Sequence, residues 1–212
     1  MLPKQKYYKI LSALFVAIIL VNLLVSFYLN NWSNILWFCS FTAALFALGL
    51  YTNNNFLLST SVTAAFFFQT LWVIEMTSYL LFGKLILGTA TYLLEIAPIR
   101  FFITFYHLLL LIIPIWVIFE KGKIHRLSWL GASLLFFIAS VSVLVLATES
   151  GVNCVNQNCN LGVFNGLSDY LSTNFSFIPF FVINWIVLSL IVFIPTHFLF
   201  SFILRFMKTK IR

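Results

Sequence analysis

Six long apolar runs, separated by short polar or basic segments, limit this chain to very few folds. The runs cover residues 8–28, 35–52, 56–78, 101–119, 127–147 and 176–204. A hydrocarbon core of about 30 Å requires about 20 apolar residues in helix, because lipid offers the backbone no hydrogen-bond partner. The runs therefore predict an all-α fold, a polytopic membrane helical bundle of about six transmembrane helices.

The composition agrees with a lipid-facing surface. Hydrophobic residues make up 62% of the chain and charged residues only 8%, against about 25% charged residues in an ordinary soluble domain. No Pro-, Ser- or charge-rich linker divides the sequence, so we expect residues 1–212 to form a single transmembrane domain. No A-x-A-like site follows the first run, which we therefore expect to remain as a helix and not to be cleaved as a signal peptide.

The basic residues predict the topology. A net charge of +7 would suit nucleic-acid binding if it were clustered on a soluble surface, but Lys and Arg stand here at the ends of apolar runs. With six spans and a cytoplasmic N-terminus, only Lys84 and Arg100 of the twelve basic residues lie outside. This agreement with the positive-inside rule predicts cytoplasmic N- and C-termini and argues against a nucleic-acid partner.

The stretch at residues 80–98 is apolar but interrupted. Gly83, Lys84, Gly88 and Glu95 break it, and a seventh span there would spoil the charge asymmetry. We therefore expect a re-entrant or interfacial segment. The sixth run is longer than one bilayer thickness requires, so it should tilt, or kink where Pro195 removes a backbone donor.

Several polar side chains fall in the outer half of the predicted bilayer, and Gln69 falls near its middle. An ionisable residue within a span costs about 2.5–3.5 kcal/mol on insertion scales, so it usually faces the bundle interior or a water-filled cavity. The candidate catalytic residues are Glu75, His107 and Cys39. The candidate substrate-binding residues are Gln69, Trp72, Asn22 and Asn184.

Each of these residues also has a purely structural interpretation. Glu75 is close enough to the outer end of its run to reach the headgroups, and His107 could bond a backbone carbonyl. Cys39 could be an inert packing residue, and the two asparagines could be interhelical hydrogen-bonding groups. The intervals from Gln69 through Trp72 to Glu75 turn about 600°, so the first and last of these do not share a helix face. His197, beside the basic tail, is most simply an interfacial anchor.

Cys154 and Cys159 lie in the external loop between the fifth and sixth runs. We predict a disulfide that closes a small loop, since an external compartment permits disulfides. The alternative is a redox pair like that of quinone-linked thiol oxidases, but such a relay needs a second dithiol and the only other cysteine is Cys39.

The histidines do not predict a metal or haem site. A zinc site needs three or four converging ligands. His107 lies toward the outer end of its run and His197 toward the inner end, so their depths differ by roughly 20 Å at helical rise. We expect no metal and no cofactor.

Several short motifs resemble those of a family of small, uncharacterised bacterial integral membrane proteins with six spans. They are Trp37-Phe-Cys39, Gln69-Thr-Leu-Trp72, His107 followed by Pro114-Ile-Trp116, Asn160-Leu-Gly-Val-Phe-Asn165 and Pro195-Thr-His197. The family pattern has an external Asn-x-Asn-Trp-Val-Phe-Gly stretch, and this chain lacks its Trp. The resemblance implies six spans in a bacterial inner membrane, and it implies no activity.

The sequence favours a protein that binds or transports a small hydrophobic or lipid-like substrate through the outer-half site. The expected partners are membrane lipids, a hydrophobic small molecule and a membrane-protein partner. One alternative is a membrane-embedded enzyme acting on a lipid or isoprenoid with the Cys/His/Glu residues, because a nucleophilic Cys needs a base such as an oriented His. The other is a structural subunit of a membrane complex. The sequence has no Walker-type phosphate loop, so this chain is not itself an ATPase.

Overall fold

The computed structural model describes residues 4–87, 102–147, 170, 173 and 180–210. Within these residues all regular structure is helical, which confirms the all-α fold. Five helices are long and apolar enough to cross a membrane. They are Gln5–Tyr28, Asn55–Phe82, Phe102–Lys121, Ser128–Leu146 and Phe180–Lys208.

The second apolar run is divided into two kinds of helix and is not the single helix expected at residues 35–52. A 3-10 helix, η1 (Trp32–Leu36), precedes α2 (Phe38–Thr52). Between them Trp37 adopts an extended conformation with ψ 138°, and its indole N–H donates to Asn34 Oδ1 at 2.9 Å. The 15 residues of α2 rise only about 22 Å, so η1, which adds about 10 Å, brings the run to about the thickness of a bilayer core.

The third helix, α3 (Asn55–Phe82), continues four residues beyond the predicted end of its run. Asn54 begins it by accepting hydrogen bonds from Phe56 N and Leu57 N, as an N-cap residue does. Gly83 ends it in the left-handed conformation, φ +65°, which favours glycine. Residues 80–82 are therefore helical, which corrects the start of the expected re-entrant segment, and residues 88–98 lie outside the described residues.

The sixth run contains the irregularity expected at Pro195, as a π turn. It consists of α8 (Phe180–Leu188), the π turn η6 (Ser189–Phe193) and α9 (Ile194–Lys210). The N–H of Ile194 donates to Ser189 O, five residues back. The wider turn ends at Phe193, two residues before Pro195, whose ring would clash with the preceding turn of a regular α-helix.

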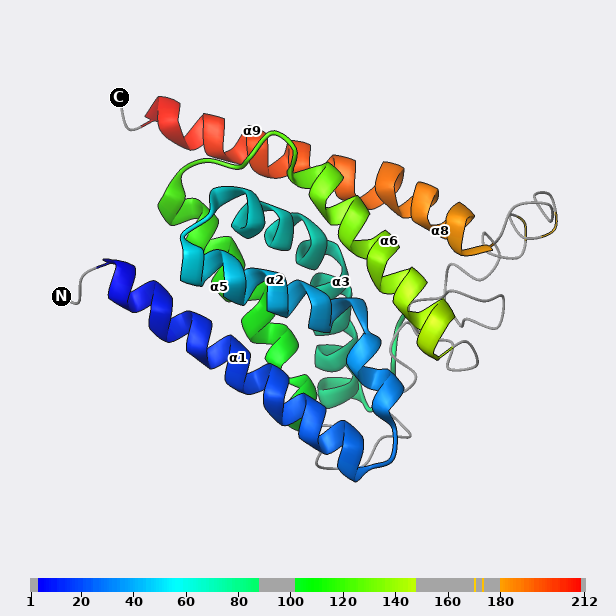
Figure 1. Cartoon of the computed structure of the whole chain (residues 1–212). Helices are drawn as coiled ribbons and strands as arrows, with labels where there is room; N and C mark the ends of the chain where they lie inside the picture. The colour runs from blue at the N-terminus through cyan, green and yellow to red at the C-terminus, as the bar shows by residue number, and fades with distance from the viewer. Residues whose placement is uncertain (1–3, 88–101, 148–169, 171–172, 174–179, 211–212) are drawn as a thin grey trace.

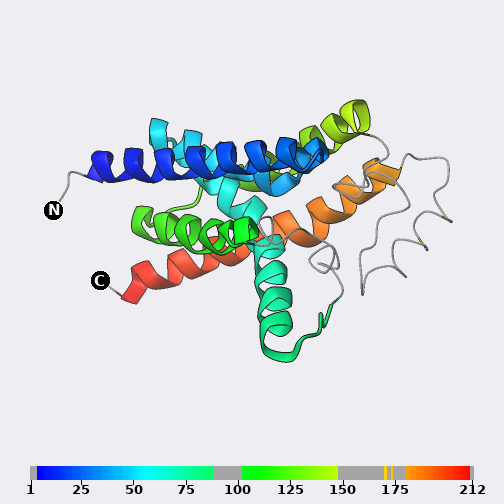
Figure 2. The same ribbon diagram turned by 90° about the horizontal axis from the view of Figure 1, so that it is seen from below.

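The central helix of the bundle is α3. It packs against α2, α5 (Tyr106–Lys121) and α6 (Ser128–Leu146), and also meets α9. Helix α1 (Lys4–Tyr28) packs on α2 at the edge of the bundle. Figure 1 shows both termini at the same end, and Figure 2 shows α3 running across the direction of α1 and α5, with its C-terminal end projecting from the bundle.

Small and hydroxyl-bearing residues form the contact between α3 and α6. Ser59, Thr60 and Thr63 on α3 are almost fully buried. Opposite them, a Cβ added to Gly131 would lie 3.0 Å from both Thr60 Cγ2 and Phe56 Cζ, and closer still to Thr60 Oγ1. Glycine therefore lets the α6 backbone lie directly against these α3 side chains, and small residues are common at such helix contacts within membranes.

Candidate functional site

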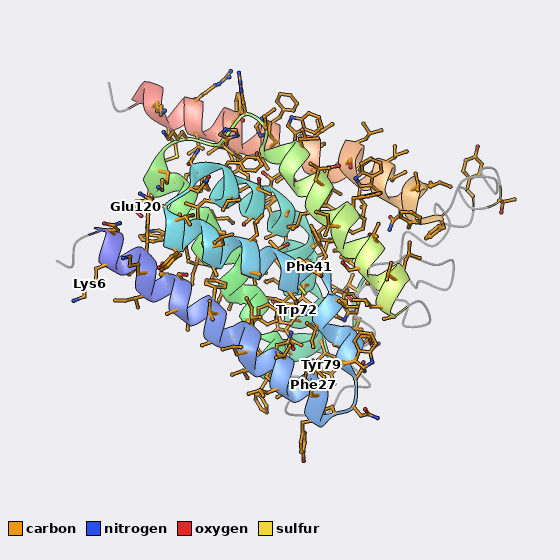
Figure 3. The ribbon with its side chains drawn as sticks, viewed as in Figure 1. Lys6, Phe27, Phe41, Trp72, Tyr79 and Glu120 are labelled. Carbon is orange, nitrogen blue, oxygen red and sulfur yellow. The ribbon has the colours of Figure 1, made fainter. Side chains whose placement is uncertain are left out.

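Three helices bring Cys39, Trp72 and His107 to one aromatic cluster. Tyr106 on α5 joins them, since its hydroxyl donates to Cys39 Sγ on α2 at 2.9 Å. The rings of Tyr106 and His107 lie 4.2 Å apart. Trp72 on α3 stacks on His107, with centroids 4.8 Å apart and planes 16° apart. Figure 3 shows Trp72 inside the bundle, away from the end marked by Lys6 and Glu120.

The hydrogen bond of His107 defines its tautomer. Its Nδ1 lies 2.6 Å from the carbonyl oxygen of Thr104. A carbonyl oxygen can only accept, so Nδ1 carries a proton, and Nε2 of the neutral ring is an acceptor. The ring is 8% exposed, which leaves this acceptor in a largely apolar environment.

Glu75 is fully buried, so it does not extend to the protein surface. Its Oε1 accepts a hydrogen bond from Leu87 N at 2.5 Å. One turn later on α3, Ser78 Oγ donates to Lys84 O at 2.6 Å. These two bonds hold the segment after Gly83 against α3. The Glu75 carboxylate therefore accepts a hydrogen bond from at least one backbone amide.

Gln69 is 2% exposed, and its Oε1 has no hydrogen-bond partner in the parts of the chain that the structure describes. Gln69 and Glu75 lie on different faces of α3, yet both are buried, at 2% and 0% exposed. Gln69 and Glu75 are therefore both interior although they do not share a face of α3. A buried polar atom without a partner costs about 1–3 kcal/mol, so each such atom calls for an explanation.

The two asparagines lie on other helices. Asn22 Nδ2 is 3.5 Å from Ser40 Oγ, which links α1 to α2. Asn184 is on α8, which packs against α6. The aromatic cluster is built instead from α2, α3 and α5, together with Thr104 just before α5.

A second polar cluster lies toward the end of the bundle that carries both termini. Ser128 Oγ is 2.8 Å from His197 Nδ1 and 3.1 Å from Thr63 Oγ1, so it joins α6 to both α9 and α3. His125 N donates to Ser59 Oγ at 2.9 Å. His197 is 8% exposed and is therefore a buried interhelical partner and not the interfacial anchor expected from sequence. No local pattern marks Ser128, which is 69 residues away from His197.

Among the described residues no group of three or more His, Cys, Asp or Glu is placed to hold a metal ion. Cys39 is a free thiol. The predicted pair Cys154 and Cys159 lies outside the described residues.

Comparisons with protein-family models, with curated proteins and with solved structures found no match for this chain.

Proposed function

We propose that this chain is a multi-pass protein of the bacterial inner membrane, with cytoplasmic termini, that binds or transports a small hydrophobic or lipid-like substrate at the α2–α3–α5 cluster. The observation that carries the proposal is Gln69, a buried amide whose Oε1 has no partner within the described residues. In lipid or in a packed core this oxygen is costly. A ligand that donates a hydrogen bond to it would remove that cost.

The surroundings of Gln69 favour an apolar ligand with a small polar head. One turn along α3, Trp72 stacks on His107 and meets the Phe105 ring edge-on with centroids 6.3 Å apart. Ligand sites are typically apolar and aromatic with a few placed polar groups. Gln69 Oε1 and His107 Nε2 are both acceptors, so the head group that suits them is a donor such as a hydroxyl.

The surroundings of the Cys39 thiol give less support to the enzyme alternative. A nucleophilic cysteine needs an adjacent base to form the thiolate. The group beside Cys39 Sγ is the Tyr106 hydroxyl, which donates to the sulfur, while His107 Nδ1 is engaged by Thr104 O. This arrangement supports a binding role for the cluster over covalent catalysis.

The test is to purify the full chain and identify co-purified small molecules by mass spectrometry. Gln69→Leu should remove the ligand and leave the stability of the ligand-free protein unchanged or higher, because it deletes an unpaired buried acceptor. His107→Phe, which keeps a ring for stacking, should weaken retention. Asn184→Leu, a polar-to-apolar change on α8, is the matched control and should retain the ligand.

The opposite result for Gln69→Leu would refute the proposal. If this variant loses stability while its ligand content equals that of the wild type, Gln69 is a structural residue. If no variant changes what is retained, the cluster is a packing core and the structural-subunit alternative is preferred.

A further inference from the structure

A basic face lies at the end of the bundle that carries both termini. Two segments distant in sequence form it, the α5–α6 loop and the last turns of α9. Its exposed cationic residues are Lys123, Arg126, Arg205 and Lys208. We call these four residues the basic face.

The α5–α6 loop is held in place by its own histidine. His125 N donates to Ser59 Oγ at 2.9 Å, and its ring packs edge-on against Phe56 with centroids 5.1 Å apart. The Ser128 N–H donates to His125 O at 3.0 Å. With His125 anchored to α3, Lys123 and Arg126 on either side of it are left exposed.

Helix α9 lies beside this loop. Gly122 ends α5 with φ +63°, and a Cβ added to it would lie 3.8 Å from Lys208 Cε, so the Lys208 side chain runs along the loop. Arg205 is three residues earlier on α9 and therefore on the same side of the helix. The bond between Ser128 Oγ and His197 Nδ1 ties the start of α6 to α9, which keeps the two segments together.

Among the described residues, acids do not balance the positive charge of this face. The structure describes two acidic residues, Glu75 and Glu120, and of these only Glu120 belongs to the segments at this end. It accepts a hydrogen bond from the Tyr8 hydroxyl at 2.9 Å, on the α1 side. Lys121 is turned the same way, since it bonds Asn53 Oδ1 and lies over the Tyr8 ring.

Apolar side chains continue from the basic face along α9. Phe202 and Phe206 are 69% and 52% exposed, and their rings stack with centroids 6.5 Å apart. Leu127 of the loop is 42% exposed. A cluster of cations next to exposed apolar side chains is complementary to a ligand with an anionic head and hydrocarbon tails.

We propose that the basic face binds the phosphate headgroup of an anionic phospholipid, whose acyl chains lie along Phe202 and Phe206. This site is separate from the α2–α3–α5 cluster, so the lipid proposal does not depend on the ligand proposed for that cluster. Each Lys or Arg near an anionic membrane surface strengthens binding by about fivefold. Removing two of the four cations should therefore weaken binding by about 25-fold.

The experiment uses the full chain in a neutral detergent. Phosphatidylglycerol or phosphatidylcholine with the same tails is titrated in, and bound lipid is counted by native mass spectrometry. We expect phosphatidylglycerol to bind at least about tenfold more tightly. Millimolar inorganic phosphate should not displace it, because free phosphate gains nothing from the apolar side chains. Equal affinity for the two lipids, or full displacement by inorganic phosphate, overturns the proposal.

Single substitutions test whether the lipid binds at the basic face. Arg126→Gln and Arg205→Gln should each reduce phosphatidylglycerol affinity about fivefold, and Arg126→Lys, which keeps the charge, should retain most of it. Lys84→Gln removes one exposed cation after α3, away from the basic face, and should change nothing. If Lys84→Gln reduces affinity as much as Arg126→Gln does, the effect is general charge attraction and the proposed site is refuted.

Discussion

A methyl group added at Gly131 should force apart the two helices at the centre of the bundle. In the structure a Cβ at this position lies 3.0 Å from both Thr60 Cγ2 and Phe56 Cζ. Apolar contacts favour about 3.5–4.0 Å, so α3 and α6 must separate by about 0.5–1 Å. The same movement would lengthen the bond between Thr63 Oγ1 and Ser128 Oγ, now 3.1 Å.

Two opposing effects determine how much Gly131→Ala changes the free energy of unfolding. Overpacking a close contact costs about 1–3 kcal/mol, whereas replacing Gly by Ala within a helix stabilises by up to about 1 kcal/mol. The added Cβ lies closer still to Thr60 Oγ1, so the overpacking cost should fall in the upper part of its range, and we expect a net loss of about 1–2 kcal/mol in the free energy of unfolding. Gly131→Val adds two further methyl groups at the same contact and should lose more.

The assay is reversible unfolding by sodium dodecyl sulfate in mixed micelles, followed by tryptophan fluorescence. Thr60→Ala supplies the control, because it removes both Thr60 atoms that the new methyl group meets and leaves only the movable end of Phe56. In the Thr60→Ala background, Gly131→Ala should be neutral or stabilising. Such a cycle isolates the contact between the two positions.

The reasoning fails if Gly131→Ala alone is as stable as the wild type. It also fails if Thr60→Ala gives no rescue. Either result would mean that α3 and α6 are not in the close contact described above.

Three further predictions concern other parts of the chain. Ser128→Ala should lower the free energy of unfolding by about 1–3 kcal/mol, because His197 Nδ1 loses a buried partner; the same unfolding assay measures it, and an unchanged value would contradict the bond. A cysteine introduced at Lys208 should stay unlabelled by a membrane-impermeant maleimide in intact cells, and labelling would place the C-terminus outside. Cys154 and Cys159 should be recovered as one disulfide when unreduced, alkylated protein is mapped by mass spectrometry, and two alkylated thiols would exclude it.

The positions of the helices could be predicted from the sequence because apolar length is a local property. The observed helix ends differ from the predicted ones where a single backbone or side-chain feature determines the end. Asn54 caps the start of α3, and the chain offers no stop signal before Gly83, so the helix runs on to Phe82. Local hydropathy carries no information on such caps.

The contacts between helices could not be predicted. Tyr106 reaches Cys39 across 67 residues of sequence, and Ser128 reaches His197 across 69. An apolar stripe identifies the buried face of a helix in water, but a helix such as α6 is apolar on most sides, and lipid and protein interior accept the same residues. Depth in the bilayer therefore grouped Glu75, His107 and Cys39 as candidate catalytic residues, whereas the rings of Trp72 and Tyr106 are the ones that contact His107.

The central position of α3 has a consequence for biogenesis. Its mean hydropathy, 1.6, is the lowest of the five candidate spans, because its first half carries buried hydroxyl groups that suit neighbouring helices better than lipid. These neighbours include α6 and α9, which the ribosome makes later. We therefore expect α3 to leave the translocon less readily than the other spans, and its insertion to be completed only when the last helix of the chain has been synthesised.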